Sequence, residues 1–285
     1  MIRRSIALAL AGATPGWAIA KDVTPEVLTH TGKWVVDYDR DGCHLYAQFG
    51  TGDALAIVRF TRYQPGDSFD LSVYGKRFRG SGPRVEAKAD FGLAGANVNK
   101  RALTGNAGEL PVIVLGQQRL VGWQGSADTA PDVTPEQEAA VKDLTLSIRG
   151  RRPVRFEFGS LAKPFAQLRH CTTTLVESWG YDPQVQASLT RPATPATSAA
   201  DWLRTDDFPI GAAMAGHNGL VQFRLDVDAE GKIAGCYVLA RTNPDDFADT
   251  TCRAVSKRGK FEPALDAEGK PVRSFFIRKV HWQAR

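Results

Sequence analysis

Residues 219–241 read GLVQFRLDVDAEGKIAGCYVLAR, and this stretch decides the fold of the carboxy-terminal part of the chain. In its first half, apolar side chains alternate with polar ones: Val221, Phe223, Leu225 and Val227 point to one side, and Gln222, Arg224, Asp226 and Asp228 to the other. A period of two is typical of a strand with one buried face. Residues 229–232 (AEGK) predict a turn, so we expect residues 233–241 to return as the partner strand.

The residues that follow predict a helix and a last strand. Pro244, Asp245 and Asp246 suit a helix N-terminus, where proline is tolerated and acidic groups meet the positive end of the helix dipole. The expected inward stripe consists of Phe247, Thr251, Ala254, Val255 and the stem of Arg258. A second turn at 266–270 precedes a strand at 271–282 (PVRSFFIRKVHW). The order strand, strand, helix, strand indicates a compact α+β module.

The preceding part of the chain is rich in short strand-like runs separated by Gly, Asp and Pro. These runs are residues 33–38, 43–49, 54–60, 68–75, 84–91, 111–115, 144–150 and 153–159. Their number and spacing predict an antiparallel β-sandwich or an open barrel. We expect residues 119–123 to form a hairpin with 111–115, and the Gly- and Asn-rich residues 92–108 to form a long surface loop.

One helix is expected to close this β-rich part. Ser160 can cap its N-terminus. The side chains at helical spacing on its inward stripe are Leu161, Phe165, Leu168, Thr172, Leu175, Val176 and Trp179. Cys171 lies at the margin of this stripe, within reach of an adjacent sheet, and Cys43 is the only other cysteine in this part of the chain. The four cysteines of the whole chain permit three pairings.

Length and composition set the domain organisation. The chain has 285 residues, of which 43% are hydrophobic, and this composition excludes disordered and collagen-like classes. Residues 1–20 resemble a secretory signal, with two arginines, a short apolar run and Ala18-Ile19-Ala20 at the end. If this segment is not cleaved, it anchors the chain in the inner membrane, and only then do we expect membrane contact. The expected organisation is a signal peptide at 1–20, a β-rich domain at 21–190, a Pro/Ala/Thr linker at 191–200 and a second domain at 201–285.

The predicted export and the net charge limit the expected compartment and the expected partners. Cleavage removes two arginines and lowers the formal charge from +5 to +3. Because the remaining charges of both signs are interspersed, we expect no nucleic-acid binding. The predicted signal places the protein in the periplasm, where an even number of cysteines favours two disulfides over free thiols.

Patterns that indicate catalysis are lacking. His30, His44, His170, His217 and His281 show no metal-ligand spacing. Asp37, Asp39 and Asp41 precede Gly42 as in a calcium loop, but the remaining EF-hand ligands are missing, so a tight hairpin is the better interpretation. We therefore expect no catalytic residues, no metal site and no cofactor. An enzyme activity on the β-rich domain is the least favoured hypothesis.

A series of short motifs near the carboxy terminus follows a recognisable order. It comprises residues 208–209 (FP), 212–213 (AA), 219 (G), 227–231 (VDAEG), 261–264 (FEPA) and 266–272 (DAEGKPV). Over about 80 residues, this series resembles the TonB carboxy-terminal domain family. Residues 168–171 and 178–183 also resemble the upstream region of energy transducers of this kind. Cys236 and Cys252 resemble the cysteine pair of many alphaproteobacterial TonB-like proteins, so the resemblance implies a Cys236–Cys252 disulfide beside a Cys43–Cys171 one.

The resemblance implies a mode of binding. TonB domains add an extended segment of an outer-membrane receptor, the TonB box, as an extra strand on an exposed sheet edge. On this chain the corresponding edge is the final strand. The implied partner-binding residues are Val272, Arg273, Ser274, Phe275, Phe276, Ile277, Arg278 and Lys279. The alternative is that the cations on this strand only protect an unpaired edge from unwanted pairing.

The chain also departs from the family pattern. Its amino terminus looks cleavable, and its only Pro-rich stretch is residues 191–200, which reach ~31 Å when extended and cannot cross the periplasm. We expect a periplasmic, non-catalytic recognition protein that is linked to energy transduction through an outer-membrane TonB-dependent receptor. The alternative is a soluble envelope adaptor that binds a protein other than a receptor.

Overall fold

The computed structural model describes residues 23–80, 82–93, 100–122, 130–242 and 246–284. The predicted signal peptide at 1–20 lies outside these residues. The structure is mixed α+β, as predicted. Its helices are α1 (Pro135–Ala140), α2 (Ala162–Ser178), α3 (Pro183–Ala187), α4 (Ile210–Met214) and α5 (Asp246–Arg258). Among the described residues, no helix has the length and apolar character needed to span a membrane.

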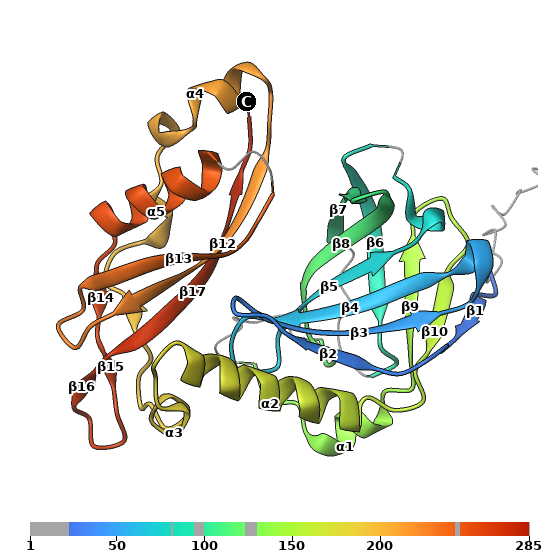
Figure 1. Cartoon of the computed structure of the whole chain (residues 1–285), viewed down its shortest axis with the longest axis horizontal. Coiled ribbons are helices and arrows are strands. Elements are labelled where there is room, and N and C mark those ends of the chain that lie inside the picture. Colours follow the sequence, from blue (N-terminus) through green and yellow to red (C-terminus); the bar gives the residue numbers. More distant parts are fainter. Residues whose placement is uncertain (1–22, 81, 94–99, 123–129, 243–245, 285) are drawn as a thin grey trace, which may run out of the picture.

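Ten strands of the amino-terminal part form one large sheet. They are β1 (Glu26–Thr29), β2 (Val35–Tyr38), β3 (Cys43–Phe49), β4 (Ala56–Arg62), β5 (Phe69–Tyr74), β6 (Arg84–Asp90), β7 (Lys100–Ala107), β8 (Leu110–Gln118), β9 (Asp143–Ile148) and β10 (Val154–Glu157). Their order is β1-β10-β9-β6-β7-β8-β5-β4-β3-β2. Among the described strand pairs of this sheet, only β1–β10 is parallel. The prediction was an antiparallel sandwich or an open barrel. The structure shows a single curved sheet that does not close into a barrel (Figure 1).

Helix α2 crosses beneath this sheet, as predicted for the closing helix (Figure 1). Its inward residues are buried, because they pack with the phenylalanines of the sheet in one apolar cluster. Phe165, for example, lies 5.3 Å from Phe60 and 5.7 Å from Phe69, ring centre to ring centre. The predicted disulfide between Cys43 on β3 and Cys171 on α2 is confirmed.

Two local predictions for this domain are wrong. Residues 119–122 form no strand, and β8 instead pairs with β7, which occupies residues 100–107 of the predicted loop at 92–108. Residues 94–99 and 123 lie outside the described residues. Strand β7 has little apolar alternation, but β6 and β8 supply it with backbone hydrogen-bond partners on both sides. A positive φ of 60° at Gly108 allows the tight turn into β8.

The carboxy-terminal module contains the predicted strands and helix. Strands β13 (Ile233–Arg241), β12 (Gly219–Val227) and β17 (Ser274–Trp282) form a sheet in the order β13-β12-β17. Helix α5 contacts β12 and β13 and buries the predicted side chains Phe247, Thr251, Ala254 and Val255. The apolar face of β12 is buried as predicted, within a second apolar cluster that is separate from that of the large sheet.

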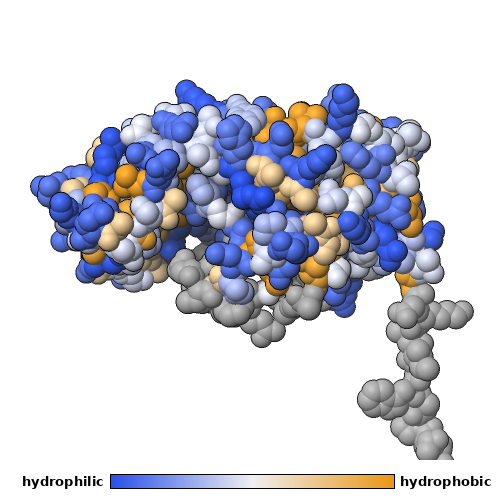
Figure 2. Space-filling model, turned by 90° about the horizontal axis from the view of Figure 1, so that it is seen from below, coloured by the Kyte–Doolittle hydropathy of each residue, from blue (hydrophilic) through white to orange (hydrophobic). Residues whose placement is uncertain are grey.

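The predicted linker at 191–200 lies against this second module. Strand β11 (Thr194–Pro195) pairs with β14 (Phe261–Glu262), and Ala193 is buried. A further hairpin is formed by β15 (Ala264–Leu265) and β16 (Pro271–Val272). Viewed from the underside of Figure 1, the surface is mostly hydrophilic, and its apolar residues form small separate patches (Figure 2).

Candidate functional site

The candidate site is the free edge of the carboxy-terminal sheet. Strand β12 lies in the centre and pairs with β13 on one side and β17 on the other, so β17 is a marginal strand. The register pairs Leu225 with Phe276 and Val221 with Val280. Within the part of the chain that the structure describes, no third strand is paired to the other side of β17. This margin has the geometry required for adding an extended segment.

The structure distributes the eight predicted partner-binding residues over two strands. Ser274 to Lys279 lie in β17, whereas Val272 lies in β16 and pairs with Ala264. Arg273 falls between the two strands. Strand β17 also continues to Trp282, three residues beyond the predicted segment. The edge is therefore displaced towards the carboxy terminus relative to the prediction.

Side chains of β17 alternate between two environments. Phe276, Val280 and Trp282 pack into the apolar cluster beneath α5. Phe275 points to the other face of the sheet, where its ring centre lies 5.4 Å from those of both Trp179 and Tyr181. The β-rich domain thus contributes side chains to a face that the sequence pattern assigns to solvent.

Arg224 of β12 is buried on this face of the sheet, beneath Trp179. The alternation of β12 predicts a solvent-facing side chain, but Arg224 is only 5% exposed. Its guanidinium carbon lies 4.2 Å from the ring centre of Trp179 and 4.4 Å from that of Tyr237, and its Nε donates to Asp226 Oδ1 at 2.9 Å. Stacking of a guanidinium between two aromatic rings is favourable, and more so when water is excluded. The predicted solvent face of β12 is therefore an interdomain contact.

The link between α2 and α3, together with most of α3, reaches the backbone beside β17. We call these residues, 179–186, the α2–α3 corner. Gly180, at a φ of 79°, ends α2, and the Tyr181 hydroxyl then donates to the carbonyl oxygen of Ser274 at 3.0 Å. Burial, followed by the Asp226 carboxylate, raises the pKa of Tyr181, so this hydroxyl stays a donor. Gln186 Nε2 donates to the Arg273 carbonyl at 3.2 Å, and Ser274 Oγ donates to Gln186 Oε1 at 2.6 Å.

An ion pair adds to the contact further along β17. Lys279 Nζ binds Asp70 Oδ2 on β5, and both side chains are mostly shielded from water. Sequence reasoning placed Lys279 at the edge but found no role for Asp70, Tyr181 or Gln186. The usable signal was the aromatic pair of Trp179, the last residue of the predicted helix stripe, and Tyr181, which follows it.

The carboxy-terminal end of β17 borders a groove. A groove of about 670 Å³ is bordered by α4, residues 203–208 and residues 280–284. Ile210 and Met214, one turn apart on α4, are 79% and 86% exposed beside it. Their exposed side chains add apolar surface at the border of the groove.

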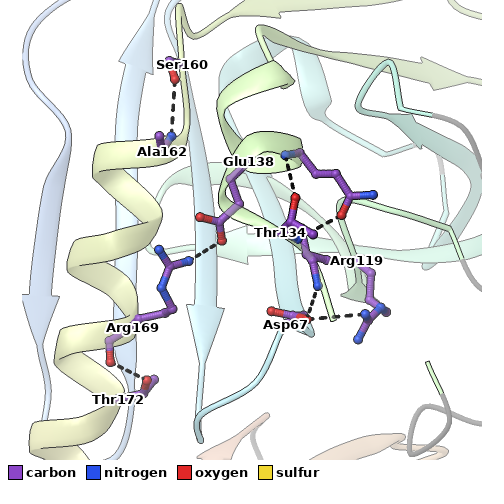
Figure 3. Close-up of polar contacts among 10 residues, drawn as sticks. Asp67, Arg119, Thr134, Glu138, Ser160, Ala162, Arg169 and Thr172 are labelled. Atoms are coloured by element: carbon purple, nitrogen blue, oxygen red, sulfur yellow. Dashed lines mark hydrogen bonds and ion pairs between the residues drawn. The ribbon is translucent and has the colours of Figure 1, made fainter. Parts of the chain in front are cut away.

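A disulfide and an ion pair join helix α2, which leads into the α2–α3 corner, to the rest of the β-rich domain. Besides the Cys43–Cys171 disulfide, its Arg169 forms an ion pair with Glu138 of α1, which is 1% exposed (Figure 3). Helix α1 starts with a capping box at Thr134 and Gln137, and Asp67 accepts a hydrogen bond from the N–H of Val133 just before it. These contacts tie α2 to the large sheet.

A further prediction concerns the second pair of cysteines. The Cys236–Cys252 disulfide implied by the resemblance is present and joins β13 to α5. Among the described residues, no group of three or more His, Cys, Asp or Glu side chains lies close enough to hold a metal ion.

Comparison with known proteins identifies the module that carries the edge. Residues 205–283 match the family described as Gram-negative bacterial TonB protein C-terminal. No curated protein matches the chain. The matched residues include α4, the three-stranded sheet, α5 and the groove. The family consists of protein-interaction domains of envelope energy transduction, which generally contact outer-membrane TonB-dependent receptors. Residues 205–283 of this chain are therefore similar to a TonB C-terminal domain.

Proposed function

We propose that this protein binds an extended segment of an outer-membrane TonB-dependent receptor as an added strand on the free edge of β17. It does so in the periplasm, after export by residues 1–20, and it carries out recognition without a catalytic step. The observation that supports the proposal is a nine-residue marginal strand, in the part that matches the TonB C-terminal family, with one side unpaired among the described residues.

The groove at the far end of β17 supports the same function. In strand addition, backbone hydrogen bonds supply affinity, and pockets for alternate side chains supply specificity. The edge of β17 offers the first, and the apolar groove beside Val280 and Trp282 offers the second. The exposed cation Arg278 discourages pairing with a second copy of this chain without preventing binding of a partner with acidic groups.

A peptide titration of the full chain tests the proposal. The probe is a fluorescent synthetic peptide with the sequence of a receptor TonB box, and fluorescence anisotropy reports binding. We expect saturable binding, and we expect the amide hydrogens of β17 to exchange more slowly with the peptide bound. No saturable binding at high micromolar peptide contradicts the function.

N-methylated peptides provide the matched control. An added strand uses the N–H groups of every second residue for the ladder, while the other N–H groups point away. Methylation of one alternate set is expected to abolish binding and methylation of the other set to leave it nearly unchanged. If both sets bind equally well, the peptide is not added as a strand.

A further inference from the structure

We propose that the β-rich domain holds a separate binding site, a pocket on the face of the large sheet opposite α2 that takes a small organic carboxylate against Arg59. The pocket has a volume of about 210 Å³ and is lined by Asp37, His44, Tyr46, Ile57, Arg59 and Tyr74. All six residues lie in strands β2 to β5, so the inference goes beyond strand addition at β17 and does not depend on it.

The strand register places these side chains on one face of the sheet. Cys43 of β3 is disulfide-bonded to α2, so Tyr46, an odd number of residues further along, points away from that helix. Tyr46 pairs with Arg59 on β4, and Ile57 of β4 pairs with Tyr74 on β5. Residues that lie opposite each other in antiparallel strands share a face, so three neighbouring strands contribute side chains to the same pocket.

Arg59 lacks partners for part of its guanidinium. Its Nη1 donates to the Tyr74 hydroxyl at 3.3 Å, whereas its Nε is shielded from water and has no hydrogen-bond partner. Among the described residues, no carboxylate forms an ion pair with Arg59. A buried donor left unpaired costs about 1–3 kcal/mol. A carboxylate matches the fork of a guanidinium with two oxygens, so it supplies the acceptors that this side chain lacks.

The other ionisable groups of the pocket leave the charge of Arg59 in place. Burial, followed by the charge of Arg59, lowers the pKa of His44 to about 4, so His44 is neutral at pH 7. Asp37 pairs with His44, is exposed to water, and lies on β2, with β3 between it and the strand of Arg59. Because water screens an exposed charge, Asp37 opposes an anion less than the half-buried Arg59 attracts it.

The size and walls of the pocket narrow the ligand class. A volume of about 210 Å³ lies below the ~300–1,000 Å³ of typical sites for drug-sized ligands, so the pocket suits a small molecule. The half-buried side chains of Tyr46, Ile57 and Tyr74 offer apolar surface to a flat body beside the cation. The ligand is a small carboxylate with such a body, and benzoate is its simplest probe.

An NMR titration of the full chain with benzoate tests the site. The side-chain N–H signal of Arg59 Nε, assigned by its loss in Arg59→Lys, is expected to move to lower field and to saturate, because this donor gains an acceptor. Benzamide has the same shape without the charge, and acetate has the charge without the ring. Benzamide and sodium chloride are expected to leave the signal nearly unchanged, and acetate is expected to bind more weakly than benzoate.

Variants of the full chain locate the bound benzoate. Arg59→Gln is expected to weaken binding at least tenfold in calorimetry, equivalent to about 1.4 kcal/mol. Arg155→Gln is the matched control, since Arg155 is half-buried on β10 of the same sheet and its Nε also lacks a partner, yet it does not line the pocket. It is expected to bind like the unmodified chain. Asp37→Asn removes the opposing charge and is expected to tighten binding about twofold.

The outcomes that overturn the inference are distinct from those of the peptide titration. If benzamide shifts the Arg59 signal as benzoate does, the pocket does not select a carboxylate. If acetate binds as tightly as benzoate, the apolar walls do not contribute, and the ligand class is wrong. If Arg59→Gln and Arg155→Gln, both folded by circular dichroism, bind benzoate alike, the ligand does not bind at Arg59. The absence of any saturable change in the unmodified chain also overturns the inference, while strand addition at β17 stands or falls by the peptide alone.

Discussion

At the scale of single residues, the pentapeptide DAEGK shows how much a local sequence decides. It occurs at 228–232 and at 266–270, and it forms the same turn both times. In each turn the Asp carboxylate accepts from the backbone N–H groups two and four residues later, at 3.0 and 2.8 Å. Gly231 and Gly269 have φ values of 78° and 76°. Because these interactions lie within five residues, the turn needs no tertiary partner.

The surroundings of the two glycines nevertheless differ, which yields a prediction. A Cβ at Gly231 would lie 2.2 Å from the carbonyl oxygen of Phe261, whereas a Cβ at Gly269 meets nothing within 4 Å. Gly269→Ala is expected to cost about 1 kcal/mol from its left-handed backbone alone. Gly231→Ala adds the clash and is expected to cost about 3 kcal/mol. Urea unfolding measures both values, and equal losses would contradict the prediction.

His44 provides a pH prediction at the same scale. Burial, followed by the nearby Arg59, lowers the pKa of His44 to about 4, and its Nδ1 lies 3.0 Å from Thr61 Oγ1. The unfolded chain takes up this proton near pH 6.5, but the folded chain does not, so stability is lost as pH falls from about 6.5 towards 4. The contribution of this residue is at most about 3 kcal/mol.

Unfolding at pH 7, 5.5 and 4.5 checks the titration of His44. In His44→Gln the free energy of unfolding is expected to depend less steeply on pH over this range. An identical slope in the chain and the variant would show that the folded state protonates His44 normally.

At the scale of elements, the two disulfides hold a helix to a sheet in each domain. Cys43–Cys171 joins β3 to α2 across 128 residues, and Cys236–Cys252 joins β13 to α5 across 16. A cross-link stabilises mainly by restricting the unfolded chain, so its effect grows with the length of the loop it closes. Replacing the long-range pair by alanines is expected to cost about 5 kcal/mol, and replacing the short-range pair about 3 kcal/mol.

Urea unfolding of the two paired-alanine variants, without reductant, measures this difference. Reductant added to the variant that lacks both pairs is the control and is expected to have no effect. A larger loss for the Cys236–Cys252 pair would contradict the loop-length explanation.

Elements also differ in how well their sequence predicts them. Strand β3 coincides with the predicted run at 43–49, because its apolar residues alternate and turn residues bound it. Strand β7 was predicted as a loop, because its backbone is paired on both sides while its side chains show no pattern. The same reasoning identified the strand that carries the candidate edge, but it predicted the strand at 271–282, whereas β17 begins at Ser274 and has the predicted end at Trp282.

At the scale of the whole molecule, the main feature is that the β-rich domain covers one face of the TonB C-terminal domain. The Lys279–Asp70 pair belongs to this interface, and its side chains are 21% and 17% exposed. Asp70→Lys places two cations opposite each other and is expected to lower the free energy of unfolding by about 2 kcal/mol. Small-angle scattering is expected to show a larger radius of gyration, because the interface loosens.

The charge-swapped chain, Asp70→Lys with Lys279→Asp, serves as the control. It restores opposite charges across the interface and is expected to recover most of the stability and the compact shape. If the double variant is as loose as the single one, the pair does not hold the domains together.

The sequence by itself determined the local features of this protein: its turns, the alternation of its core strands, the inward stripes of α2 and α5, and the motifs of the TonB C-terminal domain. Only the tertiary structure decided that Arg224 is buried, that β7 is a strand and that the α2–α3 corner packs against the start of β17. The physical reason is the distance in sequence between the groups involved. Tyr181 and Ser274 are 93 residues apart, and Asp70 and Lys279 are 209 apart. Contacts of that separation leave no periodic pattern in the chain, because they depend on how two finished domains pack.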